Sequence, residues 1–238
     1  MKRKIKNALK QAFEPPRPLS KESFLQSLPL PRCGSHDFVM SQIGYIPLWV
    51  WGISLAVLLV ALFSARYMKK DTLGILSACI PFVASCAVSE SGKSMVCRMA
   101  ELEKASLFSL KSVILARLGI IGTSHLLLLC LISPLAGAGN LSSTLRSGVY
   151  LLLPYLLTTW LSLVFSRKLH GKDITYLCMG TAIAVSGLCV ISRIRLYSFY
   201  RPEIFPCWLG MSAALAALTA LAYYRSIQRT EELSWNLF

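Results

Sequence analysis

The sequence predicts an all-α protein, a polytopic bundle of six transmembrane helices. Six intervals of 18 residues or more contain no Asp, Glu, Lys or Arg, and each is rich in aliphatic and aromatic residues: 38–65, 72–89, 118–145, 147–166, 174–192 and 204–224. A helix that rises 1.5 Å per residue needs about 20 apolar residues to cross a hydrocarbon core about 30 Å thick. These intervals fill most of the 238 residues, so we expect no soluble catalytic domain.

The charge and cysteine content support the membrane interpretation. A formal net charge of +14 is typical of nucleic-acid binding or of cytoplasmic membrane loops. Because the Lys and Arg residues lie in short segments between the apolar runs, we predict membrane lipids as partners and no nucleic acid. The eight cysteines fall mostly within the apolar runs without a Cys-x-x-Cys pair, so neither disulfides nor a zinc site is expected.

Residues 1–46 are predicted to form a basic cytoplasmic arm that ends in an interfacial helix, an elbow, at His36–Ile46. Prolines interrupt the earlier part of the arm, where they end or prevent helices. Apolar residues at Phe38, Val39 and Ile43 favour a helix lying against the membrane before the aromatic belt begins at Trp49.

A transmembrane domain is predicted over residues 47–225, followed by a cytoplasmic tail over 226–238. The predicted spans are about 48–65, 72–89, 113–135, 148–165, 174–192 and 206–224. The second is the least apolar, with Ser77, Pro81 and Ser85, so a re-entrant segment is the alternative there. Small residues in the last two spans permit close helix approach, either within the bundle or at a dimer face.

The distribution of basic residues predicts the orientation. Of the 25 Lys and Arg residues, 18 lie in the amino-terminal arm, the second and fourth connections and the tail, and seven lie in the other connections. Cytoplasmic loops carry the excess of Lys and Arg. We therefore predict a multi-pass protein of the cell membrane with both termini in the cytoplasm.

The long connection between the second and third spans has a helical pattern. Met95, Met99 and Leu102 recur at helical spacing, and Arg98 and Glu101 form a charge pair on another face. Ser109 is a candidate N-cap for the third span. The pattern predicts an amphipathic cytoplasmic helix, with a solvated or interfacial connector as the alternative.

This arrangement resembles the permease subunits of ABC-2-type exporters, including the small six-span permeases associated with bacitracin and lantibiotic resistance. Those subunits have an interfacial elbow helix, two spans, and a cytoplasmic coupling helix before the third span. The resemblance places the coupling segment at Glu90–Leu110, with Glu101, Glu103, Ser109 and Arg117 at the acidic, turn and basic positions. It covers the whole length in architecture, and its sequence motifs are loose.

The resemblance implies that a separate ABC ATP-binding subunit binds ATP and Mg and drives transport. The residues expected to contact that subunit are Met95, Arg98, Met99, Glu101, Leu102 and Glu103. Because six spans enclose little volume, a homodimer or a pair with a related permease is implied. The substrates implied are peptide antibiotics and other amphipathic compounds.

No catalytic or cofactor site of its own is expected in this chain. Residues 87–94 match a relaxed phosphate-loop pattern, but a phosphate loop follows a buried strand and this segment follows a membrane span. No Gly-x-Ser-x-Gly turn is present, and the paired glutamates have the pattern of exposed helix faces. We therefore predict a protein that is not an enzyme and holds no cofactor.

Five polar or helix-bending residues within the spans are candidates for a transport pathway or for bundle packing: His125, Pro154, Tyr155, Thr158 and Thr159. An ionisable residue at membrane depth is a functional candidate because exposing it to lipid is costly. For His125 we favour the alternative of a neutral ring, hydrogen-bonded to Thr123, Ser124 or a facing helix. A metal site built from His36, His125 and His170 is rejected because these residues lie at different depths.

The sequence therefore predicts the membrane-spanning permease subunit of an ABC-type exporter. The alternative is a non-transporting regulatory or accessory membrane protein that holds a cytoplasmic partner with its basic arm.

Overall fold

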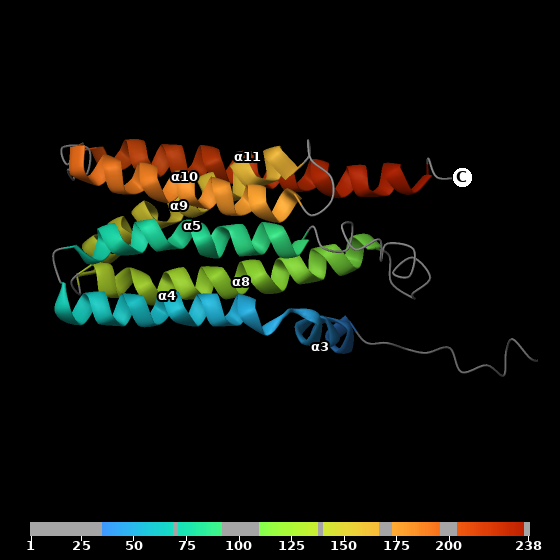
Figure 1. The fold of residues 1–238 in the computed structure, drawn as a ribbon, viewed down its shortest axis with the longest axis horizontal. Coiled ribbons are helices and arrows are strands. Elements are labelled where there is room, and N and C mark those ends of the chain that lie inside the picture. Colours follow the sequence, from blue (N-terminus) through green and yellow to red (C-terminus); the bar gives the residue numbers. More distant parts are fainter. Residues whose placement is uncertain are drawn as a thin grey trace, which may run out of the picture. The chain divides into compact units, whose positions relative to one another are not determined.

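The computed structural model describes residues 35–68, 71–91, 110–137, 140–166, 173–195 and 204–235. Within these ranges it has helices and no strands (Figure 1): α3 (Ser35–Tyr45), α4 (Leu48–Tyr67), α5 (Thr72–Ser91), α8 (Leu110–Ala136), α9 (Leu141–Ser166), α10 (Asp173–Arg195) and α11 (Phe205–Trp235). The all-α class is confirmed. Six of these helices are long and apolar enough to cross a membrane. Residues Val39–Phe238 form one compact unit, to which the packing described below belongs.

Each predicted span lies within one of the six long helices, but several helices extend beyond it. α9 begins at Leu141 rather than at residue 148, and α11 continues to Trp235 rather than ending near 224. Neither extension contains a proline, so nothing in these segments stops the helix. The end of a charge-free run therefore predicts where the apolar part of a helix ends, and the helix itself can continue further.

The least apolar predicted span forms a single helix. Helix α5 runs without a break over Thr72–Ser91, with Pro81 inside it, and is long enough to cross a membrane. A re-entrant segment would turn back on itself within this range. The continuous helix therefore disagrees with the re-entrant alternative.

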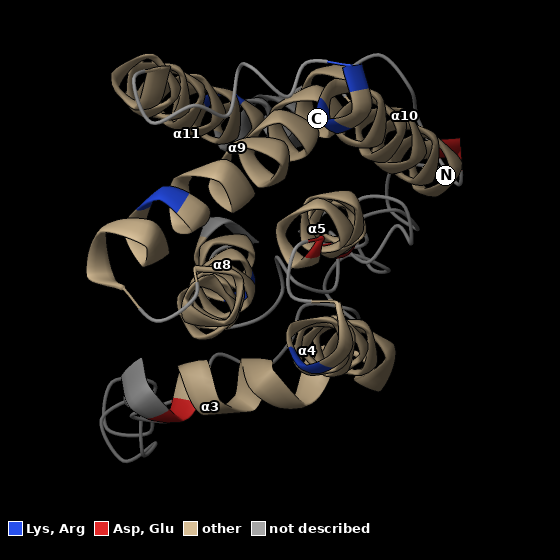
Figure 2. Ribbon diagram, turned by 90° about the vertical axis from the view of Figure 1, so that its left-hand side faces the viewer, with Lys and Arg blue, Asp and Glu red and all other residues tan. Residues whose placement is uncertain are grey.

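Helix α5 lies at the centre of the compact unit. It packs against α4, α8, α9 and α10, and Figure 2 shows these four helices around it. In its most apolar stretch 61% of the residues are buried, against 17% to 39% in the other five long helices. Small side chains such as Ala84 and Ser85, which are almost fully buried, allow neighbouring helices to approach closely.

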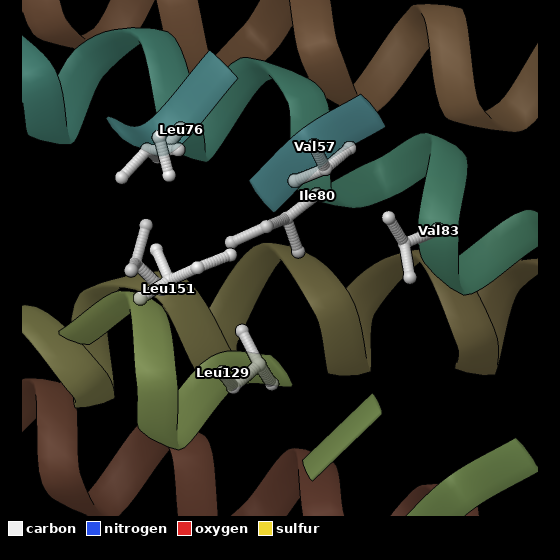
Figure 3. Close-up of a cluster of buried hydrophobic side chains, with 8 residues drawn as sticks. Val57, Leu76, Ile80, Val83, Leu129 and Leu151 are labelled. Atoms are coloured by element: carbon white, nitrogen blue, oxygen red, sulfur yellow. The ribbon is translucent and has the colours of Figure 1, made fainter. Parts of the chain in front are cut away.

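Three apolar clusters among the described residues hold the helices together. The first joins α4, α5, α8 and α9, and most of its residues are labelled in Figure 3: Val57, Ala61, Leu76, Ile80, Val83, Leu129, Ile132 and Leu151. The second consists of Ile46, Val50, Ala87 and Ile121. The third joins α5, α9, α10 and α11 through Val88, Leu163, Cys178 and Ala222.

The outer side of α4 is covered by large apolar side chains that nothing in the described part of the chain buries. They include Leu48, Leu55, Leu59, Leu62 and Phe63, each between 48% and 87% exposed. A continuous apolar surface of this kind marks a contact with lipid or protein. Together with the six apolar helices it supports a multi-pass membrane protein.

The turn between α8 and α9 depends on a glycine. A Cβ atom on Gly137 would lie 2.7 Å from backbone atoms of Thr144, which is closer than real Cβ contacts. The Gly137 N–H donates to the Ser133 carbonyl at 3.0 Å, and the Thr144 N–H donates to the Asn140 carbonyl at 2.8 Å. A side chain at residue 137 would therefore force the two helix ends apart.

Candidate functional site

The structure brings together two of the five candidate residues within the spans, His125 and Tyr155. His125 of α8 is 1% exposed, and its Nδ1 lies 3.2 Å from the hydroxyl oxygen of Tyr155 on α9. The two rings meet edge to face with their centroids 5.9 Å apart. Of the partners considered for His125, the facing helix provides the one observed, because the Thr123 and Ser124 hydroxyls donate to carbonyls of α8 itself.

His125 interrupts an otherwise apolar face of α8. Ile121, four residues earlier, belongs to the second cluster, and Leu129, four residues later, belongs to the first. Residues four apart lie on one face of a helix, so the imidazole lies between the two clusters. Its Nε2 is buried and has no hydrogen-bond partner among the described residues.

The other three candidates, Pro154, Thr158 and Thr159, lie near Tyr155 on α9 and are buried. The Thr158 hydroxyl donates to the Pro154 carbonyl at 2.7 Å, and the Thr159 hydroxyl donates to the Leu156 carbonyl at 2.8 Å and to the Tyr155 carbonyl at 3.1 Å. Such bonds satisfy the hydroxyl protons within their own helix. The threonines can thus face the bundle interior without a partner on another helix.

A second polar contact between helices was missed in the sequence. The hydroxyl oxygens of Ser162 on α9 and Thr181 on α10 lie 2.8 Å apart, and Ser162 is fully buried. The available signal was the presence of hydroxyl residues in apolar runs, where polar side chains tend to face other helices. Nothing in the sequence identifies which two of the many hydroxyl residues meet.

Glu90 is buried within the last turn of α5. The sequence interpretation placed it at the start of the coupling segment, but α5 continues to Ser91 and Glu90 is only 7% exposed. An acidic residue with so little exposure is unusual, because a buried carboxylate loses its hydration. The helix therefore extends two residues further toward the connection than the charge-free run indicated.

Polar contacts also fix α3 to the beginning of α8. The Arg117 Nε–H donates to Gln42 Oε1 at 3.2 Å, and the Arg117 guanidinium carbon lies 5.9 Å from the centre of the Tyr45 ring. Directly beside them in sequence, Ile46 belongs to the second cluster with Ala87 of α5 and Ile121 of α8. We call this set the junction: Gln42, Tyr45, Ile46, Val50, Ala87, Arg117 and Ile121.

The sequence indicated only one residue of the polar part of the junction. Arg117 was singled out by the resemblance, whereas Gln42 and Tyr45 were not. Gln42 is 7% exposed. The available signal in the sequence was its polar side chain, in a helix expected at the membrane surface.

The predicted contact residues for an ATP-binding subunit lie in the segment 92–109, outside the described residues: Met95, Arg98, Met99, Glu101, Leu102 and Glu103. Within the ranges that the structure does describe, no group of three metal-ligating side chains occurs.

No family model matches the chain, and the searches of curated proteins and of solved structures return no match.

Proposed function

We propose that this chain is the membrane-spanning subunit of an ABC-type exporter. A separate ATP-binding subunit hydrolyses ATP with Mg, and the chain exports an amphipathic or peptide-like compound as a homodimer or with a related permease. α3 is the interfacial elbow, and the connection from residue 92 to residue 109 carries the coupling helix. Both termini lie in the cytoplasm in this proposal, which the excess of Lys and Arg in the terminal segments and in two of the connections supports.

The junction is the observation that carries this proposal. The connection leaves from the end of α5 and returns at the start of α8. Ala87, in the last turns of α5, and Ile121, about three turns into α8, belong to one apolar cluster. The same cluster includes Ile46 and Val50 at the passage from α3 to α4. A partner that pulls on the connection would therefore act on α3, α4, α5 and α8 together.

The contacts of Arg117 connect α8 to α3 in addition to this packing. Arg117 lies two turns into α8, which begins at Leu110, and reaches back to Gln42 and Tyr45. A bond from an Arg side chain to a buried amide has a defined geometry, since the planar guanidinium donates in fixed directions. A movement of the start of α8 would thus be passed to α3. Such coupling is what a transporter driven by a separate motor subunit requires.

The test is co-purification of the full-length chain from its native membranes, followed by mass spectrometry. We expect an ATP-binding subunit to be retained by the wild type and lost from the double variant Glu101→Lys/Glu103→Lys. The matched control is Glu231→Lys/Glu232→Lys, which reverses the same charges at the other paired glutamates and should retain the partner.

The opposite result would favour the accessory-protein alternative. If no ATP-binding subunit is recovered with the wild type, and ATP hydrolysis by the membranes is unchanged when the chain is deleted, the exporter proposal is wrong.

A further inference from the structure

The imidazole of His125 uses one ring nitrogen and leaves the other unused. Nδ1 meets the Tyr155 hydroxyl at 3.2 Å, while Nε2 is buried without a hydrogen-bond partner in the described part of the chain. A neutral imidazole donates at one nitrogen and accepts at the other. Whichever tautomer is present, Nε2 can therefore form one more hydrogen bond, and leaving that bond unmade inside a protein is unfavourable.

The side chain of His125 lies where two apolar clusters meet. His125 lies between the first and second clusters, and α5 contributes Val83 to the first cluster and Ala87 to the second. Gly122, one turn before His125, is partly exposed, and a Cβ atom there would meet no other atom within 4 Å. The surface of α8 is thus uncovered by other described helices one turn before the buried imidazole.

A guest that bonds to Nε2 must be uncharged, because the helices packed against this part of α8 offer no counter-charge. They carry no Asp, Glu, Lys or Arg over 48–65 in α4, 72–89 in α5, 147–166 in α9 and 205–224 in α11, and α8 itself carries none over 118–136. The titratable group that contacts His125 is the Tyr155 hydroxyl, and the first carboxyl along α5 is that of Glu90, three residues beyond Ala87. An ionised guest or an imidazolium would be a buried charge without a partner.

We propose that Nε2 of His125 is a binding point for a neutral hydrogen-bonding group. In the resting protein this group is a water molecule. The other occupant rests on the function proposed above: during transport, the hydroxyl or amide of an exported amphipathic compound replaces the water. Buried waters commonly complete the hydrogen bonds of polar groups in this way.

The first experiment detects the water. The full-length chain carrying His36→Gln and His170→Gln retains His125 as its single histidine, and is labelled with ¹⁵N-histidine in lipid nanodiscs. NMR should show a neutral ring that receives magnetisation from water protons. A ring that receives none, or an imidazolium at neutral pH, would overturn the proposal.

Two matched substitutions separate a role of Nε2 from a role of Nδ1. In His125→Gln the amide nitrogen takes the place of Nε2, and in His125→Asn it takes the place of Nδ1. We expect the melting temperature in nanodiscs to stay near the wild-type value for Gln and to fall for Asn and for His125→Leu. If Asn retains the wild-type value and Gln does not, the ring serves only Tyr155 and the proposal fails.

A set of probes with the same alkyl tail and different head groups tests whether an amphipathic compound can replace the water. Dodecanol, dodecanoate and dodecyltrimethylammonium are added to the labelled protein. Dodecanol should reduce the water signal at His125 several-fold, and the two ions should leave it unchanged. If none of the three reduces the signal, water is the only occupant and the part concerning exported compounds is wrong. The water signal does not depend on an ATP-binding partner, so this outcome is distinct from a failed co-purification.

Discussion

Helices α4 and α5 have the same length of 20 residues and pack against each other, yet they meet opposite surroundings. α5 is enclosed by four helices, whereas α4 presents a row of Leu and Phe side chains that no described residue covers. α4 is the more apolar of the two. In a bilayer, lipid is as apolar as a protein core, so small side chains that allow close packing favour the interior. Side-chain size separates these two helices better than hydropathy does.

Equal truncations in the two helices should give the largest difference. Leu76 of α5 is 0% exposed and Leu59 of α4 is 57% exposed. Leu76→Ala leaves a cavity in the first cluster and should lower the free energy of unfolding by about 2–5 kcal/mol. Leu59→Ala should change it by less than about 0.5 kcal/mol. Unfolding in mixed micelles titrated with dodecyl sulfate measures both, and equal losses would contradict the central placement of α5.

The reverse change, adding volume, should have an intermediate effect. Ala84 of α5 is 0% exposed, whereas Ala56 of α4 is exposed. Ala84→Leu forces neighbouring helices apart and should lower the free energy of unfolding by about 1–3 kcal/mol. Ala56→Leu adds a side chain on the uncovered face and should be nearly neutral. A nearly neutral Ala84→Leu would show that the packing around α5 is loose.

Removing a hydroxyl while keeping size nearly constant should have the smallest effect in both helices. The Ser85 hydroxyl donates to the Phe82 carbonyl at 2.8 Å, and the Ser54 hydroxyl donates to the Val50 carbonyl at 3.2 Å. Neither of these bonds joins two helices. Ser85→Ala and Ser54→Ala should therefore each change the free energy of unfolding by less than about 0.5 kcal/mol in the same titration. A loss above about 1 kcal/mol for Ser85→Ala alone would mean that polarity, and not size, fixes α5.

The helices of this protein were predictable because each depends on residues close in sequence. Charge-free runs located all six long helices, since a charge at membrane depth is costly. They did not locate the ends of α9 and α11, because a helix continues into water until a breaker or a cap stops it. For the same reason Glu90 was assigned to the connection, although it forms part of the last turn of α5.

The contacts of the candidate site were less predictable because they join residues far apart in sequence. His125 and Tyr155 are 30 residues apart, and both were selected individually as polar residues within spans. Their meeting depends on the rotation of α8 and α9 about their axes, which periodicity in such uniformly apolar helices does not define. Ser162 and Thr181 were missed for the same reason.

The tight turn at Gly137 gives the α8–α9 pair the mechanics of a lever. The helix ends are held close at the turn, so a rotation of α8 about that point would move its far end most. Arg117 lies about 30 Å from this fulcrum and His125 about 18 Å, at 1.5 Å per residue. A rotation of about 5° would displace Arg117 by about 2.6 Å and His125 by about 1.6 Å. A small rotation at the turn would thus displace α8 most where it meets α3, and would displace the imidazole of His125 less.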